Sequence, residues 1–137
     1  MGTGNGRAVK KSATKHGAVI LCGGKSSRMG TAKALLPVGP ELMLQRVVRI
    51  VGEVVAAENI VVVSAVGQPL PALPGNVLFA TDARADRGPL EGLAAGMSAL
   101  GDRVDVVYAT SCDVPLLQPA FVERMFELIG ADSPGGW

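Results

Sequence analysis

The sequence predicts an α/β domain in which helices connect the strands of a mainly parallel sheet. Short runs of consecutive apolar residues, often β-branched, are typical of strands that other layers cover on both faces. Helical stretches fall between and after these runs, as in strand, crossover, strand units. The expected strands are 18–22, 60–65, 77–80 and 105–110, and the expected helices are 41–57, 89–100 and 120–129. With 137 residues and 48% hydrophobic content, the chain has enough apolar material for one core.

The first expected strand, 18–22, runs directly into a glycine-rich, cationic loop that contains no acid. Glycines allow sharp turns and close approach to a ligand. Backbone donors and cations at the carboxyl end of a strand suit a polyphosphate. The spacing departs from both the P-loop and the G-x-G-x-x-G fingerprint, so neither class is predicted. The glycines and cations of the loop are Gly23, Gly24, Lys25, Arg28, Gly30 and Lys33; Lys25 is interpreted equally well as a solvated loop cation.

The following segments are assigned from spacing and from proline. Pro40 is well placed as the first helical residue before 41–57, where valines and leucines recur at helical spacing. The run 60–65 is β-branched and short, which favours a second buried strand. Three prolines in the connection 68–75 exclude a long helix there.

The second half of the chain repeats the alternation. Asp82 ends the third strand, and Pro89 begins a helix of small residues that allows close packing on the sheet. The fourth strand stops at Ser111-Cys-Asp113, and Pro119 opens the last helix. We therefore expect Asp82 and Asp113 to leave the sheet at strand ends.

The ends of the chain are predicted to lie outside the folded domain, which spans 16–130. Residues 1–15 form a basic arm without periodicity, and 131–137 form a tail, so both are expected to be disordered. His16, the single histidine, is interpreted as a solvated loop residue. All seven Lys and Arg of residues 1–40 precede the first acid, which would suit nucleic acid. No aromatic residues interleave with them and the remainder is acidic, so no nucleic-acid partner is predicted.

The composition predicts a cytoplasmic protein without membrane contact. The apolar runs are far shorter than the ~20 residues of a membrane span, and the amino terminus lacks a secretory signal. Thiols are normally reduced in such a compartment. Cys22 and Cys112 are accordingly expected to be small buried residues at strand ends.

Three motifs together resemble the MobA-like nucleotidyltransferase family, and the molybdenum cofactor guanylyltransferases within it. Leu21-Cys-Gly-Gly-Lys-Ser-Ser-Arg-Met-Gly-Thr-Ala-Lys33-Ala-Leu-Leu is similar to the family signature L-x-G-G-x-S-x-R-M-G-x-x-K-x-L-L. Gly88-Pro-Leu-Glu-Gly-Leu-Ala-Ala-Gly96 and Ser111-Cys-Asp113-Val-Pro115 follow in the family order. The resemblance covers about residues 17 to 129. It implies a Rossmann-like α/β/α architecture with the strand order third, second, first, fourth.

The resemblance also implies which residues form the site. Arg28 and Lys33 are the catalytic candidates, because they would hold the β- and γ-phosphates and offset the charge of the departing pyrophosphate. Asp113 is expected to anchor Mg²⁺, the expected cofactor, which prefers one or two carboxylates plus phosphate oxygens and waters. In parallel α/β sheets such residues meet at the carboxyl ends of the strands. The nucleotide-binding candidates are Leu21, Cys22, Gly23, Lys33, Asp82 and Asp113.

The implied reaction transfers GMP from GTP to molybdenum-bearing molybdopterin and releases pyrophosphate. GTP and that pterin are the expected partners, with transient contact to proteins that make or receive the cofactor. Two departures leave alternatives open. Ser64 stands where the family often has asparagine, so a cytidylyltransferase or another nucleotidyltransferase is an alternative. The family's C-terminal elements are missing after Ile129, so a nucleotide-binding remnant that transfers poorly is another.

Overall fold

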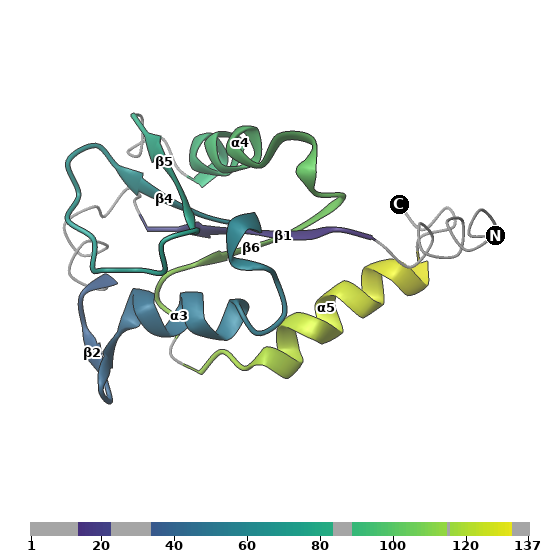
Figure 1. Ribbon diagram of the computed structural model, residues 1–137, viewed down its shortest axis with the longest axis horizontal. Helices are drawn as coiled ribbons and strands as arrows, with labels where there is room; N and C mark the ends of the chain where they lie inside the picture. The colour runs from purple at the N-terminus through teal and green to yellow at the C-terminus, as the bar shows by residue number, and fades with distance from the viewer. Residues whose placement is uncertain (1–13, 23–33, 84–88, 115, 133–137) are drawn as a thin grey trace.

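The computed structural model of the protein describes residues 14–22, 34–83, 89–114 and 116–132 (Figure 1). Its centre is a parallel sheet in the order β5-β4-β1-β6, which confirms the predicted order of third, second, first and fourth strand. The strands of this sheet are β1 (His16–Leu21), β4 (Ile60–Ala65), β5 (Leu78–Asp82) and β6 (Val106–Ser111). Because all three pairings are parallel, the carboxyl ends of the strands lie along one edge of the sheet.

The register places the ends of β1 and its neighbours side by side. Leu21, the last residue of β1, pairs with Val63 of β4 and with Ser111 of β6. On the far side of β4, Ala65 pairs with Asp82 of β5. A ligand at this edge would therefore meet residues from every strand of the sheet.

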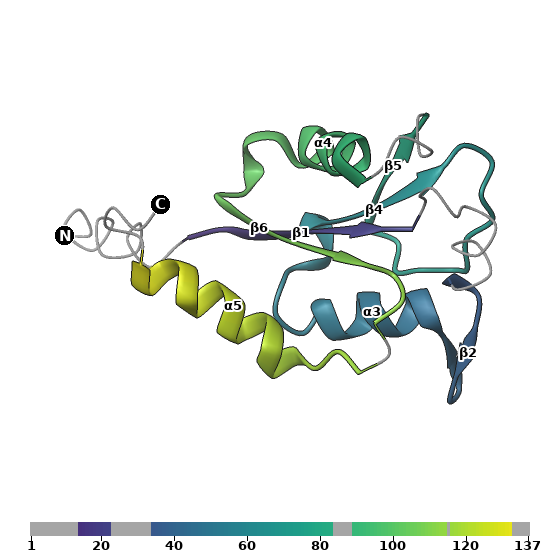
Figure 2. The same cartoon turned by 180° about the vertical axis from the view of Figure 1, so that it is seen from behind.

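Helices cover both faces of the sheet, as the α/β/α prediction requires (Figures 1 and 2). Helices α3 (Met43–Val51) and α5 (Pro119–Asp132) lie on one face, and α4 (Pro89–Leu100) lies on the other. Alternate residues of β1 enter the two cores: Ile20 packs in the cluster with Leu44 of α3, whereas Val19 packs in the cluster with Leu100 of α4. Burial on both faces explains the unbroken apolar run of this strand. Single turns of 3₁₀ helix lie at Ala57–Asn59 and Gly101–Arg103.

Helix α4 approaches the sheet closely because two of its residues have no side chain. A Cβ atom on Gly96 would lie 2.7 Å from Cγ1 of Val19, which is closer than packed carbon atoms can come. A Cβ on Gly92 would lie 3.2 Å from a side-chain carbon of Leu21. The predicted close packing of this small-residue helix is thus confirmed, and its predicted bounds match the structure.

Helix α3 is shorter than the predicted 41–57, and Pro40 is not its first residue. Residues 37–42 instead form a small hairpin of β2 (Pro37–Val38) and β3 (Glu41–Leu42). Gly39 adopts φ +64° in its turn, a conformation that glycine tolerates without strain. At the other end the helix closes at Gly52, whose N–H donates to Val48, yet Val55 is still buried beyond it. The apolar spacing therefore continued past the helix and misplaced its end.

His16 is not the solvated loop residue that was predicted. It is the first residue of β1, two residues before the expected start of the strand, and pairs with Val106 of β6. Its ring stacks on Phe126 of α5, with ring centroids 3.9 Å apart and planes within 10°. Burial lowers the pKa of His16, and the charge of Asp105 opposes that shift. Sequence spacing could not reveal this contact, because the two residues lie 110 positions apart.

The observed bounds of β5, β6 and α5 differ from the predicted ones by a few residues. Strands β5 and β6 begin and end slightly later than expected, and Asp82 is the last residue of β5. Helix α5 continues to Asp132, beyond the expected end at 129. Residues 1–13 and 133–137 lie outside the described part, so their predicted disorder stays a prediction. Among the residues that the structure describes, every helix is too short or too polar to cross a bilayer.

Candidate nucleotide site

The described candidates gather at the carboxyl edge of the sheet. Leu21 ends β1 and Cys22 follows it, Asp82 ends β5, and Asp113 follows the end of β6 by two residues. Parallel strands with helical crossovers place these positions together, as the sequence predicted. The predicted residues Gly23, Arg28 and Lys33, together with Lys25, lie outside the described residues, so their roles stay predictions. The segment that carries them begins and ends in the core, because Cys22 is 2% exposed and Ala34 is fully buried.

Asp82 is a buried acid, with only 8% of its surface exposed. Its Oδ2 atom would lie 3.2 Å from a Cβ on Gly92, at the same distance as Cδ2 of Leu21. Asp82 and Leu21 therefore lie against the same stretch of α4, on one face of the sheet. The first turn of a helix carries partial positive charge from its free N–H groups, which favours a carboxylate nearby.

Asp113 is half-buried, and a neighbour on its own strand orients it. The Ser111 hydroxyl donates to Oδ1 of Asp113 at 2.5 Å, a short charge-assisted contact. Strands β4 and β1 separate β5 from β6. At the usual strand spacing the two acidic strand ends are about 14 Å apart, too far to share one cation. Asp82 and Asp113 thus lie at opposite sides of the carboxyl edge of the sheet.

The end of β1 is fixed by hydrogen bonds to both of its neighbours. The Cys22 N–H donates to Val63 O at 2.8 Å, and the Cys112 N–H donates to Leu21 O at 3.1 Å. These bonds continue the sheet one residue beyond β1 and fix the position of Cys22.

Gln68 is a residue that the sequence analysis missed. Its side-chain Nε2 donates to the Cys22 carbonyl at 3.3 Å, while its Oε1 accepts from the Ala65 N–H at 2.9 Å. The glutamine therefore ties the end of β4 to the residue that directly follows β1. The available signal was its place directly after a strand-ending turn, at the edge where the loop was expected.

The two cysteines are buried, which confirms the prediction for them. A side-chain hydrogen bond with Cys112 raises the pKa of Cys22, and burial raises it further. Cys22 is therefore a neutral thiol at physiological pH. Its side chain brings no charge to the site, so its contribution to a ligand lies in its backbone groups.

An apolar cavity of about 490 Å³ adjoins Asp113. Tyr108 of β6 and Phe121 of α5 meet there in an edge-to-face contact with ring centroids 6.5 Å apart. The described residues that line it are Tyr108, Asp113, Val114, Leu116, Leu117, Gln118 and Phe121. Leu116 is 87% exposed, so this apolar surface opens to solvent beside the acid.

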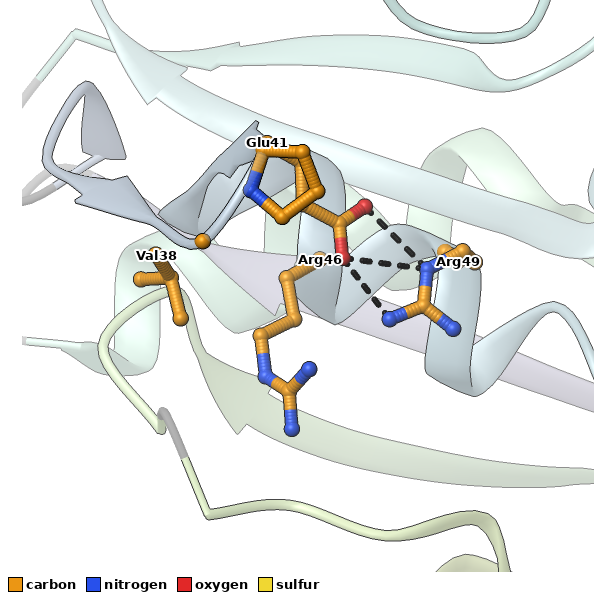
Figure 3. Close-up of a pocket in the computed structure, with 6 residues that line it drawn as sticks. Val38, Glu41, Arg46 and Arg49 are labelled. Carbon is orange, nitrogen blue, oxygen red and sulfur yellow. Dashed lines mark hydrogen bonds and ion pairs between the residues drawn. The ribbon is translucent and has the colours of Figure 1, made fainter.

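A second, more open cavity of about 670 Å³ lies beside the β2–β3 hairpin and α3 (Figure 3). Arg49 donates to Glu41 through Nε at 3.1 Å and through Nη2 at 2.7 Å, and Arg46 lines the same cavity. The bond to Arg49 lowers the pKa of Glu41 and raises the pKa of Arg49. None of the predicted site residues that the structure describes lines this cavity.

Asp82 and Asp113 are the predicted site residues whose carboxylates could contribute to a metal site. Within the described ranges no group of three or more His, Cys, Asp or Glu side chains could hold a metal. Mg²⁺ commonly takes one or two carboxylates and completes its shell with water and substrate phosphate. The oriented Asp113 carboxylate matches that ligand set.

Comparison with known proteins identifies the family. Residues 18–135 match the MobA-like NTP transferase domain. A protein of Mycobacterium tuberculosis H37Rv named as a probable molybdenum cofactor guanylyltransferase is 36% identical over 110 residues, which are 78% of this chain and 53% of that protein. A protein of the same name from Pelotomaculum thermopropionicum is 38% identical over 109 residues, 80% of this chain and 50% of that protein.

A solved structure shares the fold. The crystal structure of Rv0371c from Mycobacterium tuberculosis H37Rv superposes with a TM-score of 0.66 at 23% identity, covering 86% of this chain and 61% of that one. The chain spans about half the length of the curated relatives it matches. The sequence motifs, the strand order and the family match agree, and the chain belongs to the MobA-like NTP transferase family.

Proposed function

We propose that the chain binds GTP at the carboxyl edge of its sheet and acts in the transfer of GMP to molybdenum-bearing molybdopterin. The observation that carries this proposal is the common edge of Leu21, Asp82 and Asp113 in a MobA-like chain. The names of its relatives, probable molybdenum cofactor guanylyltransferases, support guanine as the base and the pterin as acceptor.

In this proposal the strand ends position the nucleotide. Backbone groups of Leu21, Cys22 and Gly23 meet the guanine, and the bonds from Gln68 and to Val63 hold Cys22 in place for it. Asp82, buried against α4, contacts the nucleotide from the β5 side. Arg28 and Lys33 hold the β- and γ-phosphates and neutralise the leaving pyrophosphate.

The proposed transfer needs no nucleophile from the protein. The terminal phosphate of the pterin attacks the α-phosphorus of GTP. A new phosphoanhydride bond forms, the bond from the α-phosphorus to the bridging oxygen breaks, and pyrophosphate leaves. Catalysis of this kind consists of alignment and charge neutralisation. Asp113 would hold Mg²⁺, which neutralises charge on the phosphate oxygens.

The test is the thermal midpoint of unfolding with GTP, CTP and ATP, each with Mg²⁺. A ligand that binds only the native state stabilises it by about 2.7 kcal/mol at a hundredfold excess over Kd. We expect GTP to raise the midpoint most. A larger shift with CTP would favour the cytidylyltransferase alternative, and equal shifts with all three would remove the guanine assignment.

Transfer itself is tested by incubating the chain with GTP, Mg²⁺ and molybdenum-loaded molybdopterin, and measuring pyrophosphate and the dinucleotide product. Formation of both products in equal amounts supports the proposed reaction. Nucleotide binding without either product would limit the function of this chain to binding.

A further inference from the structure

We propose that Cys22 and Cys112 are a dithiol modification site, at which a reversible intrachain disulfide forms beside the candidate nucleotide site. The register brings the two residues together. Leu21 and Ser111 are paired in β1 and β6, and the next residue on each strand is a cysteine. The Cys112 N–H still donates to Leu21 O at 3.1 Å, so the parallel alignment continues to this pair.

The backbone spacing suits a disulfide. Neighbouring strands lie about 4.8 Å apart, within the range of roughly 4.4 to 6.8 Å that bridged Cα atoms occupy. Both side chains point to the same face of the sheet, because both belong to the core cluster under α3 and α5. Their exposed fractions are 2% and 3%, so they share one apolar environment.

The two side chains already contact each other. Cys22 and Cys112 are joined by a side-chain hydrogen bond, so the sulfur atoms face one another in the reduced protein. The register, the shared face of the sheet and the side-chain contact together place the two thiols next to each other. The fold therefore holds the reduced pair close to the arrangement that a disulfide needs.

The chemistry balances with a disulfide oxidant such as oxidised glutathione. One cysteine attacks a glutathione sulfur, forming a mixed disulfide and releasing one reduced glutathione. The other cysteine then attacks the protein sulfur of that mixed disulfide, forming the Cys22–Cys112 bond and releasing the second glutathione. The protein loses two electrons and two protons, and both appear in the two reduced glutathione molecules. Thiol reductants reverse both steps.

The position of the Cys22–Cys112 disulfide gives it an effect on nucleotide binding, and this effect rests on the proposed function. Cys22 immediately precedes the glycine-rich loop, and Cys112 immediately precedes Asp113. Bringing the sulfurs from contact to a bond of about 2.05 Å turns the two side chains and fixes the distance between the strand ends that carry them. The bonds from Gln68 to Cys22 and from Ser111 to Asp113 lie directly beside the movement. Oxidation should therefore weaken nucleotide binding.

The first experiment measures the disulfide without reference to nucleotide. The protein is equilibrated in buffers of fixed reduced and oxidised glutathione, from reduced and from oxidised starting material, both natively and in concentrated urea. The native samples are prepared by refolding the protein in each buffer, so that glutathione can reach the two buried thiols. After acid quenching and alkylation, intact mass gives the ratio of disulfide to dithiol.

We expect this ratio to be more than tenfold higher in the native protein than in urea, because the fold holds the sulfurs in contact. Cys22→Ala and Cys112→Ala are the controls and should show only glutathione adducts. An equal or lower ratio in the native protein would overturn the proposal, as would disulfides that join two chains.

The second experiment compares binding of GTP with Mg²⁺ to the reduced and oxidised proteins. We expect the oxidised protein to bind several-fold more weakly than the reduced protein, and Cys112→Ala without a glutathione adduct to bind equally after oxidising and after reducing treatment. Equal binding by the two forms would overturn the regulatory consequence. If the reduced protein fails to bind nucleotide at all, the proposed function fails, whereas the mass measurement still decides the disulfide.

Discussion

At the scale of single residues, the charge of Asp113 is the most direct test of the proposed magnesium site. Asp113→Asn preserves size and can still accept from the Ser111 hydroxyl, but it removes the charge that attracts the cation. We expect binding of Mg²⁺-GTP to weaken tenfold or more, about 1.4 kcal/mol. Metal-free GTP should bind as before or better, because a carboxylate repels phosphates when no cation intervenes. Isothermal titration with and without Mg²⁺ measures both.

Asp102→Asn is the matched control for this substitution. Asp102 is exposed in the turn before β6, at the opposite edge of the sheet, and should leave both affinities unchanged. If Asp113→Asn also leaves both unchanged, the aspartate is a structural residue of the strand end and the metal assignment is wrong.

A second residue, His16, predicts how stability depends on pH. Burial lowers its pKa in the folded protein from the ordinary value near 6.5, so the unfolded chain binds more protons below that value. The stabilising effect of the neutral ring is complete above pH ~6.5 and declines as pH falls toward the folded pKa. We expect the thermal midpoint to fall between pH 7.5 and 5.

His16→Gln removes this titration, since the chain has a single histidine. The difference between the pH profiles of the two proteins isolates its contribution from that of the carboxylates. Parallel profiles would show that the stacking on Phe126 tolerates the charged ring.

At the scale of elements, the contact of α4 with the sheet depends on Gly96. Gly96→Ala places a Cβ 2.7 Å from Val19 and 3.1 Å from Val63, so the helix or the valines must move. Overpacking typically costs about 1–3 kcal/mol, and the better helix propensity of alanine returns at most ~1 kcal/mol. We expect a lower free energy of unfolding by urea denaturation. Ser98→Ala, at an exposed position of the same helix, should not lower it.

Helices and strands could be predicted from the sequence where a pattern of nearby residues determines them. The strands 60–65 and 18–22 were visible because both faces are buried, and α4 because Pro89 marks its start. The β2–β3 hairpin was missed because Pro40 suits a turn as well as a helix start, and only the positive φ of Gly39 decides between them. Of the candidate site residues, the positions of Asp82 and Asp113 could be predicted, because the predicted strand order places both at strand ends. The role of Gln68 could not, because it depends on a contact 46 positions away.

At the scale of the whole molecule, the edge of the sheet predicts self-association. Among the described residues β6 pairs with β1 alone, and the strand Val106–Ser111 contains neither charge nor proline. Natural edge strands usually carry such residues, because bare edges pair with other chains. We expect the elution volume in size-exclusion chromatography to decrease with protein concentration.

A lysine on the edge tests this directly. Ala109→Lys, at an exposed position of β6, should reduce the association, and Ala94→Lys on the exposed face of α4 should not. If the unmodified protein elutes as a monomer at every concentration, the edge is protected and the prediction fails.

The central position of β1 also determines when the chain can fold. The strands that pair with β1 are synthesised later than β1 itself. Ala18 pairs with Ile60 of β4, and His16 pairs with Val106 of β6, which lies 90 positions after His16. At ribosomal rates of about 5–20 residues per second, the first strand waits roughly 5–18 s for its second partner to be made. During that interval one side of an apolar strand from the middle of the sheet has no partner strand, and unpaired strand edges of this kind favour aggregation.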